Sequence, residues 1–247
     1  MKRTFLSIAG LAIAVLSGCS GPTTPTVNNP PQVNYAVQTK YVYTQQTLDA
    51  NSGQRTGTVD TITATVVATN FAYQGKTNVT EFVNTHSNGS EPDTSYIAQD
   101  SGRFWHYNYG LESLNENSAV LAAIGKPVQD GWVLQAEFNV AAGASWVGAD
   151  TSLSATFRGI PLHATLLDSV SETTDTNIVS VRSSTGTALN FAAGHAVHHV
   201  TLQGLSGSGQ NDTYVSEQYG PVVDIVNPST IQGMATPGRI TVLIQAP

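Results

Sequence analysis

The sequence predicts an all-β, mostly antiparallel domain, and three observations lead to this prediction. Apolar and polar residues alternate with a period of two in many short segments that are rich in Val, Thr and Tyr. Clusters of turn-forming residues separate these segments, for example Asn88-Gly89-Ser90. Hydrophobic residues make up 40% of the 247 residues, which is enough for a sizeable core.

The charge balance excludes one class of partner. The chain has 10 Lys+Arg against 17 Asp+Glu, which gives a formal net charge of −7. A chain with this balance offers no basic surface to a phosphate backbone. We therefore expect no nucleic-acid partner.

The first 18 residues have the pattern of a signal peptide. Lys2 and Arg3 precede an apolar run over residues 6–16, which is too short to span a bilayer as a helix. The run ends in Leu16-Ser17-Gly18-Cys19, which resembles the lipobox of bacterial lipoproteins, and Cys19 is the only cysteine of the chain. The resemblance implies cleavage before Cys19 and acylation of its thiol, with the membrane as a partner through the acyl chains. The alternative is an ordinary secretory signal that happens to end near a cysteine.

Residues 19–33 are predicted to be a tether between this anchor and the folded domain. The segment contains four prolines and no charged residue, a composition that favours extended polyproline II geometry. Residue 20 is Ser rather than Asp, and the sorting rule of lipoproteins from two-membrane bacteria then implies the outer membrane, with the protein facing the periplasm or the cell surface. A single β domain is expected over residues 34–247.

The predicted strands begin with the alternation over residues 35–43. The next run, residues 59–69, has a more apolar face formed by Ile62, Ala64, Val66 and Ala68. Similar runs follow at residues 79–83, 96–98, 104–107, 132–140, 153–157, 162–167, 178–181, 188–191, 196–202, 214–217, 222–226 and 240–244. Residues 111–125 differ, because their apolar spacing suits either one short helix or a wrapped connector.

The chain contains a weak internal match at an offset of 118 residues. Tyr96 aligns with Tyr214, and Gly102 aligns with Gly220. The match predicts two similar meanders over residues 34–110 and 126–247. The alternative is that any two antiparallel meanders share such residues.

The second half resembles a group of envelope lipoproteins. The resemblance lies in Gly131-Trp132, the segment from Phe191 to His195, and Gly220-Pro221-Val222-Val223. They are similar to sheet-opening and strand motifs of the LolA/LolB and TapB-like half-barrel lipoproteins. This resemblance implies a strongly curved antiparallel sheet, or incompletely closed barrel, and brings no enzymatic residues with it.

Three histidines close together in the sequence are candidate metal ligands. His195, His198 and His199 would converge on a helix, but on a strand His195 and His199 share a face while His198 points the other way. Val and Thr around them favour a strand, so we predict no metal and no cofactor; a site completed by neighbouring strands is the alternative. No nucleophile elbow or phosphate-binding loop occurs, and we expect no catalytic residues.

Aromatic residues supply the remaining candidate site. As a strand, residues 104–109 place Trp105, Tyr107 and Tyr109 on one face, with Phe104 and His106 on the other. The three rings could stack on sugars, line an apolar groove, or belong to the core of the domain.

The expected function is that of a membrane-anchored, non-enzymatic lipoprotein. Its concave β surface is expected to bind a hydrophobic ligand or an envelope protein partner. The alternatives are a surface-exposed adhesion or carbohydrate-binding β-sandwich and a metal-dependent hydrolase.

Overall fold

The computed structural model describes residues 32–109, 131–138, 140, 143–157, 160–183, 185–203, 207–231 and 233–247. Fourteen strands in these ranges belong to one antiparallel sheet. No helix in the described part of the chain is both long and apolar enough to cross a bilayer. The predicted helix or connector at residues 111–125 lies outside the described residues.

The strands follow one another along the chain with mostly short connections. They are β1 (Lys40–Leu48), β2 (Arg55–Tyr73), β3 (Lys76–His86), β4 (Asp93–Asp100), β5 (Arg103–Tyr107), β6 (Trp132–Glu137), β7 (Ala144–Phe157), β8 (Ile160–Arg182), β9 (Ala188–Gln203), β10 (Gly207–Ser216), β11 (Gly220–Val226), β12 (Ser229–Ile231), β13 (Met234–Thr236) and β14 (Gly238–Gln245). Their order across the sheet is β6-β5-β4-β3-β2-β1-β14-β11-β10-β9-β8-β7, and the small β12–β13 hairpin pairs with β10.

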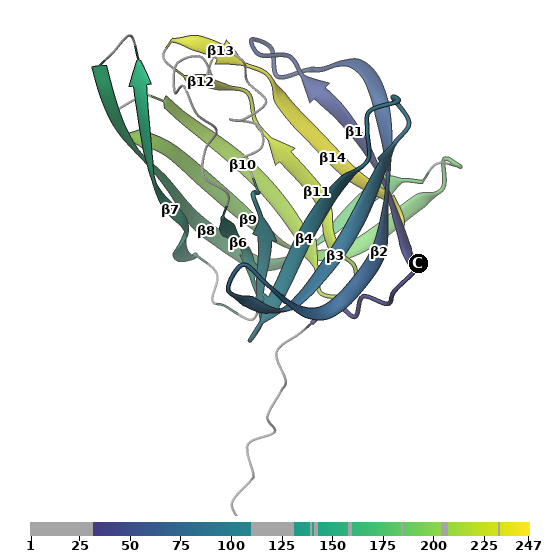
Figure 1. Cartoon of the computed structure of the whole chain (residues 1–247). Helices are drawn as coiled ribbons and strands as arrows, with labels where there is room; N and C mark the ends of the chain where they lie inside the picture. Colours follow the sequence, from purple (N-terminus) through teal and green to yellow (C-terminus); the bar gives the residue numbers. More distant parts are fainter. Residues whose placement is uncertain are drawn as a thin grey trace, which may run out of the picture.

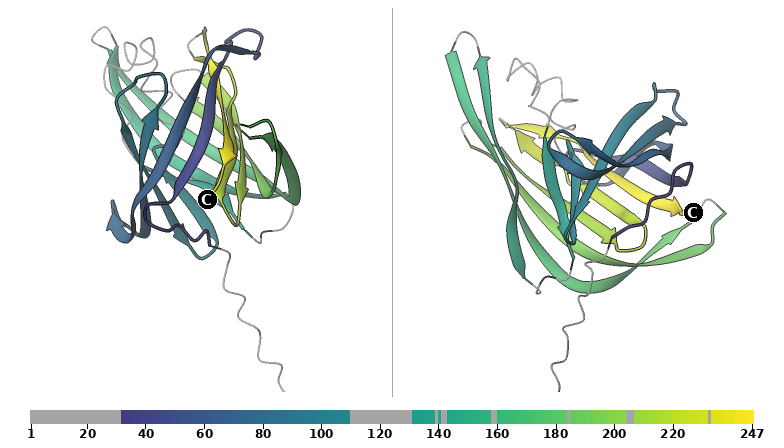
Figure 2. Two further views of the ribbon diagram at one scale, coloured as in Figure 1. Left: turned by 90° about the vertical axis from the view of Figure 1, so that its right-hand side faces the viewer. Right: turned by 60° about the horizontal axis from the view of Figure 1, so that its bottom comes forward.

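The sheet curls into a trough (Figures 1 and 2). Its two ends, β6 and β7, share no ladder of hydrogen bonds among the described residues, so the barrel stays incompletely closed. Sheet twist accumulates over many strands and produces this curvature. The predicted fold class is confirmed.

Two meanders meet where β1 pairs with β14. The strands β1 to β6 form one of them, because β6 pairs with β5 through the register Tyr107↔Trp132. The second half was expected to begin at residue 126, whereas β6 pairs with the first meander. The pairing of β6 with β5 depends on contacts across the sheet, which the composition of the linking segment does not encode.

The two segments of the internal match form comparable hairpins. Gly102 and Gly220 each have a positive φ, of 84° and 78°, in the β4–β5 and β10–β11 turns. At Gly220 a Cβ atom would collide with the Tyr35 hydroxyl and lie 3.5 Å from Cζ of Phe104. Glycine is therefore required there both by the backbone angle and by the close approach of the core.

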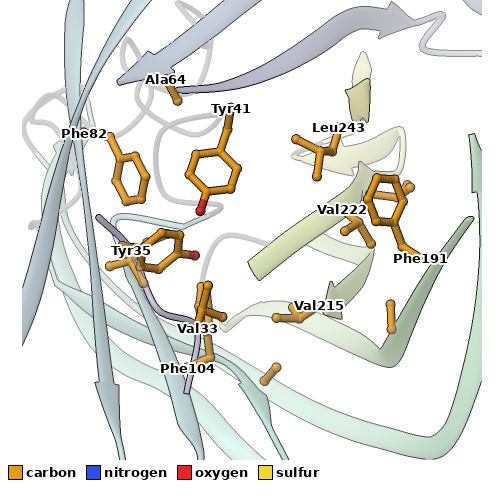
Figure 3. Close-up of a cluster of buried hydrophobic side chains, with 14 of the residues drawn as sticks. Val33, Tyr35, Tyr41, Ala64, Phe82, Phe104, Phe191, Val215, Val222 and Leu243 are labelled. Atoms are coloured by element: carbon orange, nitrogen blue, oxygen red, sulfur yellow. The ribbon is translucent and has the colours of Figure 1, made fainter. Parts of the chain in front are cut away.

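The hydrophobic core lies on the concave side of the trough (Figure 3). Tyr35 contacts Tyr41 and Phe82 edge-on, with ring centroids 5.6 and 5.1 Å apart. Strands from both meanders contribute, including Phe104 from β5 and Leu243 from β14, neither of which is exposed. The apolar face predicted for residues 59–69 is confirmed for Ile62, Ala64 and Val66, all of which are buried.

The segment before β1 is fastened inside the trough. The Gln99 side chain accepts a hydrogen bond from the Val33 amide at 2.7 Å and donates one to the Val33 carbonyl at 2.9 Å. Both residues are buried. Val33 was expected in the tether, but it belongs to the folded body, because the side-chain amide of Gln99 bonds its backbone as a neighbouring strand would.

Two strands are longer than the sequence indicated. β8 is one strand of 23 residues, whereas only residues 162–167 and 178–181 were expected there. It pairs with β7 on one side and β9 on the other, and these two ladders keep its polar residues 168–172 extended. Likewise, Gly207, Ser208 and Gly209 were expected in a turn but begin β10, paired with β9.

Candidate ligand pocket

A cavity of about 350 Å³ opens on the concave face of the sheet. Its apolar wall comes from the first meander: Tyr43 on β1, Ile62 and Ala64 on β2, Phe82 on β3 and Ile97 on β4. Alternation along each strand turns these side chains inward, as it does for the core beneath them. The volume lies within the range of about 300–1,000 Å³ that is usual for small-molecule sites.

The opposite wall carries a carboxylate held by two hydroxyl groups. Asp224 on β11 accepts hydrogen bonds at Oδ1 from Tyr109 Oη at 2.6 Å and from Thr213 Oγ1 at 2.9 Å. Asp224 and Tyr109 line the cavity. The two donors fix one carboxylate oxygen toward the protein rather than toward a ligand.

Tyr109 does not share the face of Trp105 and Tyr107, contrary to the expectation from sequence. β5 ends at Tyr107, and Asn108 has a positive φ of 62°. This left-handed residue reverses the alternation, so the Tyr109 side chain turns into the cavity. Asparagine adopts such angles more readily than most residues, which was the available signal.

Three buried polar atoms at the cavity lack a hydrogen-bond partner among the described residues. They are Nδ1 of His106, Oε1 of Gln135 and Nε of Arg239. Burial lowers the pKa of His106 to about 4, although Asp224 opposes the shift and Arg239 adds to it. His106 is therefore neutral near pH 7. Buried polar groups are almost always satisfied, so unpartnered ones at a cavity point to a bound molecule or to ordered water.

A charged clasp of Asp60, His86 and Asp93 lies at the cavity, and His86 and Asp93 contribute to its lining. His86 on β3 contacts Asp60 through Nδ1 at 2.7 Å and Asp93 through Nε2 at 2.8 Å. Burial lowers the pKa of His86, but the bonds to Asp60 and Asp93 outweigh it and raise the pKa above its ordinary value. Burial raises the pKa of Asp60, and the bonds from His86, Ser87 and Asn88 outweigh it and lower that pKa. The clasp joins β2, β3 and the start of β4.

We predict that this clasp makes stability depend on pH. A raised folded-state pKa of His86 stabilises the protein fully below about pH 6.5, and this contribution is lost as the pH rises through the raised value. The lowered pKa of Asp60 stabilises the protein above about pH 3.8, and this contribution is lost as the pH falls through the lowered value. His86→Gln should lower the unfolding free energy at pH 6 by about 1–2 kcal/mol, and by less at pH 9, as measured by urea unfolding. The exposed His199→Gln is the control, and an equal loss for His86→Gln at both pH values would contradict the prediction.

The three histidines of the weak metal alternative lie apart in the structure. His198 is fully buried and its Nε2 lies 3.0 Å from the Gln135 carbonyl oxygen, whereas His199 is exposed. His195 stacks on Tyr214 and contacts Asp212 at 3.0 Å. Their strand geometry divides them between the two faces of the sheet. Among the described side chains, no group of three His, Cys, Asp or Glu residues is arranged to hold a metal ion.

The other two aromatic candidates lie away from the cavity. Lys76 covers Trp105, with Nζ 3.3 Å from the ring centroid. Tyr107 belongs to an aromatic cluster on the opposite face of the sheet, and none of its members is fully buried; they are Phe71, Tyr73, Tyr96, Tyr107 and Trp132. The three predicted rings therefore have different surroundings: Trp105 lies under Lys76, Tyr107 lies in the aromatic cluster, and Tyr109 lines the cavity.

Sequence reasoning missed Arg239, Asp224 and His86 as parts of the candidate site. Arg239 and Asp224 come from strands that are neighbours in space only through the β11–β14 pairing. His106 was placed on the face opposite Trp105, and it does point into the cavity. A signal in the sequence was the charge at inward positions of apolar strands, because buried charges are rare without a purpose.

Comparisons with known proteins match the fold rather than a family. No protein-family model matches the chain, and no curated protein matches it. One similar solved structure is a candidate lipoprotein from Parabacteroides distasonis ATCC 8503, with a TM-score of 0.51 and 10% identity, over 87% of this chain and 97% of that one. Another is a candidate exported protein with a YmcC-like fold from Bacteroides fragilis NCTC 9343, with a TM-score of 0.49 and 12% identity, over 88% and 99%.

Proposed function

We propose that the protein is a non-enzymatic lipoprotein of the bacterial envelope that binds a hydrophobic ligand in the concave pocket. The observation that carries this proposal is the cavity of about 350 Å³, which has an apolar wall from β1 to β4 and a few buried polar atoms from β5, β6 and β14. Pockets for small amphipathic molecules combine these two kinds of lining.

The anchor in this proposal is Cys19. The lipobox-like Leu16-Ser17-Gly18-Cys19 and the uncharged tether support it. The similar structure from Parabacteroides distasonis is itself described as a candidate lipoprotein, and the resemblance of the second half to LolA/LolB and TapB-like lipoproteins agrees with it. Ser20 favours the outer membrane, on its periplasmic or external side.

The absence of enzymatic activity is also part of the proposal, and the rim histidine supports it. Both ring nitrogens of His86 contact carboxylates, so neither nitrogen is available to take a proton from a nucleophile. The nearby Ser87 hydroxyl donates to Asp60 rather than to the imidazole. An arrangement of this kind ties strands together instead of activating a serine.

Native mass spectrometry tests ligand binding. A soluble chain that begins at residue 20 keeps every described residue and is purified without detergent. The expected result is an adduct of one amphipathic molecule per chain, or one saturable site for an apolar dye. A preparation that carries no adduct and binds no dye would overturn the ligand proposal and leave the anchor untouched.

Replacement of Cys19 by serine tests the anchor. The variant is expected to leave the membrane fraction completely, because serine cannot receive the thioether-linked diacylglycerol. Acyl chains contribute ~0.8 kcal/mol for each buried CH₂ group, so losing them removes stable attachment. Fractionation and metabolic labelling with a palmitate analogue measure the effect, with Ser20→Ala as the matched control. Labelled, membrane-bound Cys19→Ser protein would contradict the lipoprotein assignment.

A second candidate function is carbohydrate binding on the aromatic cluster of the opposite face. Tyr73 stacks on Tyr96 with centroids 4.1 Å apart, and Tyr107 and Trp132 extend the ring surface. Such faces stack on sugars. The β-sandwich expected with this alternative is wrong, because the described strands form one curved sheet. Quenching of tryptophan fluorescence by soluble glycans would support this function, and unchanged spectra across neutral and acidic glycans would oppose it.

A further inference from the structure

The charged groups that line the pocket differ in whether the protein itself supplies their hydrogen-bond partners. Asp93 is bonded by Asn84 at 2.6 Å and by His86 at 2.8 Å. Asp224 accepts from Tyr109 and Thr213. Both carboxylates of the lining thus have donors from the protein itself.

Arg239 is the exception among the charged lining residues. It lies at the start of β14, paired with Val226 of β11 and Thr47 of β1. Among the described residues, its buried Nε has no hydrogen-bond partner, and no carboxylate comes within ion-pairing distance of it. A guanidinium group is charged at every physiological pH and presents its donors in a fork that fits an anionic oxygen pair.

Among the described lining residues, no other positively charged group is available to bind an anion. His86 is occupied by its two carboxylates, and His106 is neutral near pH 7 because of its burial. Arg239 is partly buried, and its buried Nε–H without a partner carries a desolvation cost that a ligand supplying an anionic oxygen would offset. The apolar wall of Ile62, Phe82 and Ile97 then faces the rest of that ligand.

The volume limits the length of the apolar part. A water-sized group, taken here as one non-hydrogen atom, occupies about 30 Å³. A cavity of about 350 Å³ therefore holds roughly a dozen non-hydrogen atoms. This corresponds to a single acyl chain of about ten carbons with its head group. Two chains of that length would exceed the volume of the cavity.

We propose that the pocket binds a single-chain amphiphile with an anionic head group, which Arg239 recognises while the chain lies against the wall of Ile62, Phe82 and Ile97. This inference rests on the proposed ligand-binding function and specifies its ligand class. The head group is a carboxylate or a phosphate, which share the oxygen pair that Arg239 requires.

Four probes with the same ten-carbon chain test the proposal. They are decanoate, decyl phosphate, decan-1-ol and decyltrimethylammonium, titrated into the soluble chain near pH 7.5 by isothermal titration calorimetry. One of the two anions is expected to bind at least tenfold more tightly than decan-1-ol, and the cation more weakly than the alcohol. The stronger of the two anions identifies the head group.

Arg239→Gln and Arg239→Lys complete the experiment. Arg239→Gln should reduce affinity for the preferred anion at least tenfold, to near that of decan-1-ol, and leave the affinity for decan-1-ol within about twofold. Arg239→Lys keeps the charge and should retain part of the preference. Unchanged binding of decan-1-ol also shows that the variant pocket is folded.

The outcomes separate the two proposals. If no probe binds, the ligand-binding function fails and this inference fails with it. If decan-1-ol and the anions bind equally, or if Arg239→Gln keeps the tenfold preference, the pocket binds chains but the anionic recognition is overturned.

Discussion

Replacement of Phe104 by alanine is expected to lower the free energy of unfolding by about 3–5 kcal/mol. Phe104 has no exposed surface and belongs to the largest buried side chains of the protein. It stands on β5 between Gln99 of β4 and Ala136 of β6, and its ring reaches toward Gly220 of the other meander. Loss of the ring removes buried apolar surface and leaves a cavity that hydrogen-bonded strands cannot close by moving together.

Equilibrium unfolding in urea measures this effect. Phe104→Leu keeps most of the volume and should cost less than about 1.5 kcal/mol. Ile178→Ala is the matched surface control, because Ile178 is 68% exposed, and it should change stability by less than about 0.5 kcal/mol. A loss below about 1 kcal/mol for Phe104→Ala would mean that the two meanders do not depend on this contact.

Gly238→Ala is the second substitution with a large expected effect, a loss of about 3 kcal/mol in unfolding free energy. A Cβ atom at Gly238 would overlap the Val226 carbonyl oxygen and lie 2.7 Å from the Pro228 nitrogen. Both atoms belong to the backbone, so no side-chain rotation relieves the clash. β14 would have to shift away from β11, which weakens the ladder that starts at Val226↔Arg239.

Gly131→Ala is the control for this prediction, because a Cβ atom there meets nothing within 4 Å. Thermal unfolding followed by circular dichroism compares the two variants. Because Arg239 is the next residue, Gly238→Ala should also weaken binding of anionic amphiphiles. Equal stability of the two alanine variants would show that β14 tolerates displacement.

The fold class was predictable because its determinants are local. Period-two alternation over residues 59–69 identified the buried face with Ile62, Ala64 and Val66, as the structure confirms. Strand ends were less predictable: β8 stays extended through polar residues 168–172 because they have a partner on each side. The alternation at residues 104–109 failed at Asn108, where one left-handed residue moves Tyr109 to the other face.

The candidate site was less predictable because its parts come from distant segments. Arg239 and His106 are separated by well over a hundred residues and meet only after the sheet curls. The charge of Arg239 within an apolar strand was the one available signal, and it does not say which residues Arg239 meets. The rim contact between Asp60, His86 and Asp93 likewise requires the registers of β2, β3 and β4. The alternation along a strand determines to which face of the sheet a side chain points. The pairing of strands that are distant in sequence determines which residues that side chain contacts.

The fastening of Val33 by Gln99 also has a mechanical consequence. A force applied to the chain ahead of residue 33 acts first on two buried hydrogen bonds and on the packed ring of Tyr35, not on the free edge of a strand. A pulling force would therefore be transmitted to β4 and to the hydrophobic core, and it would not separate β1 from its neighbouring strands first. Under such a force we expect the concave sheet to keep its shape, because the load enters it at Val33 and Gln99.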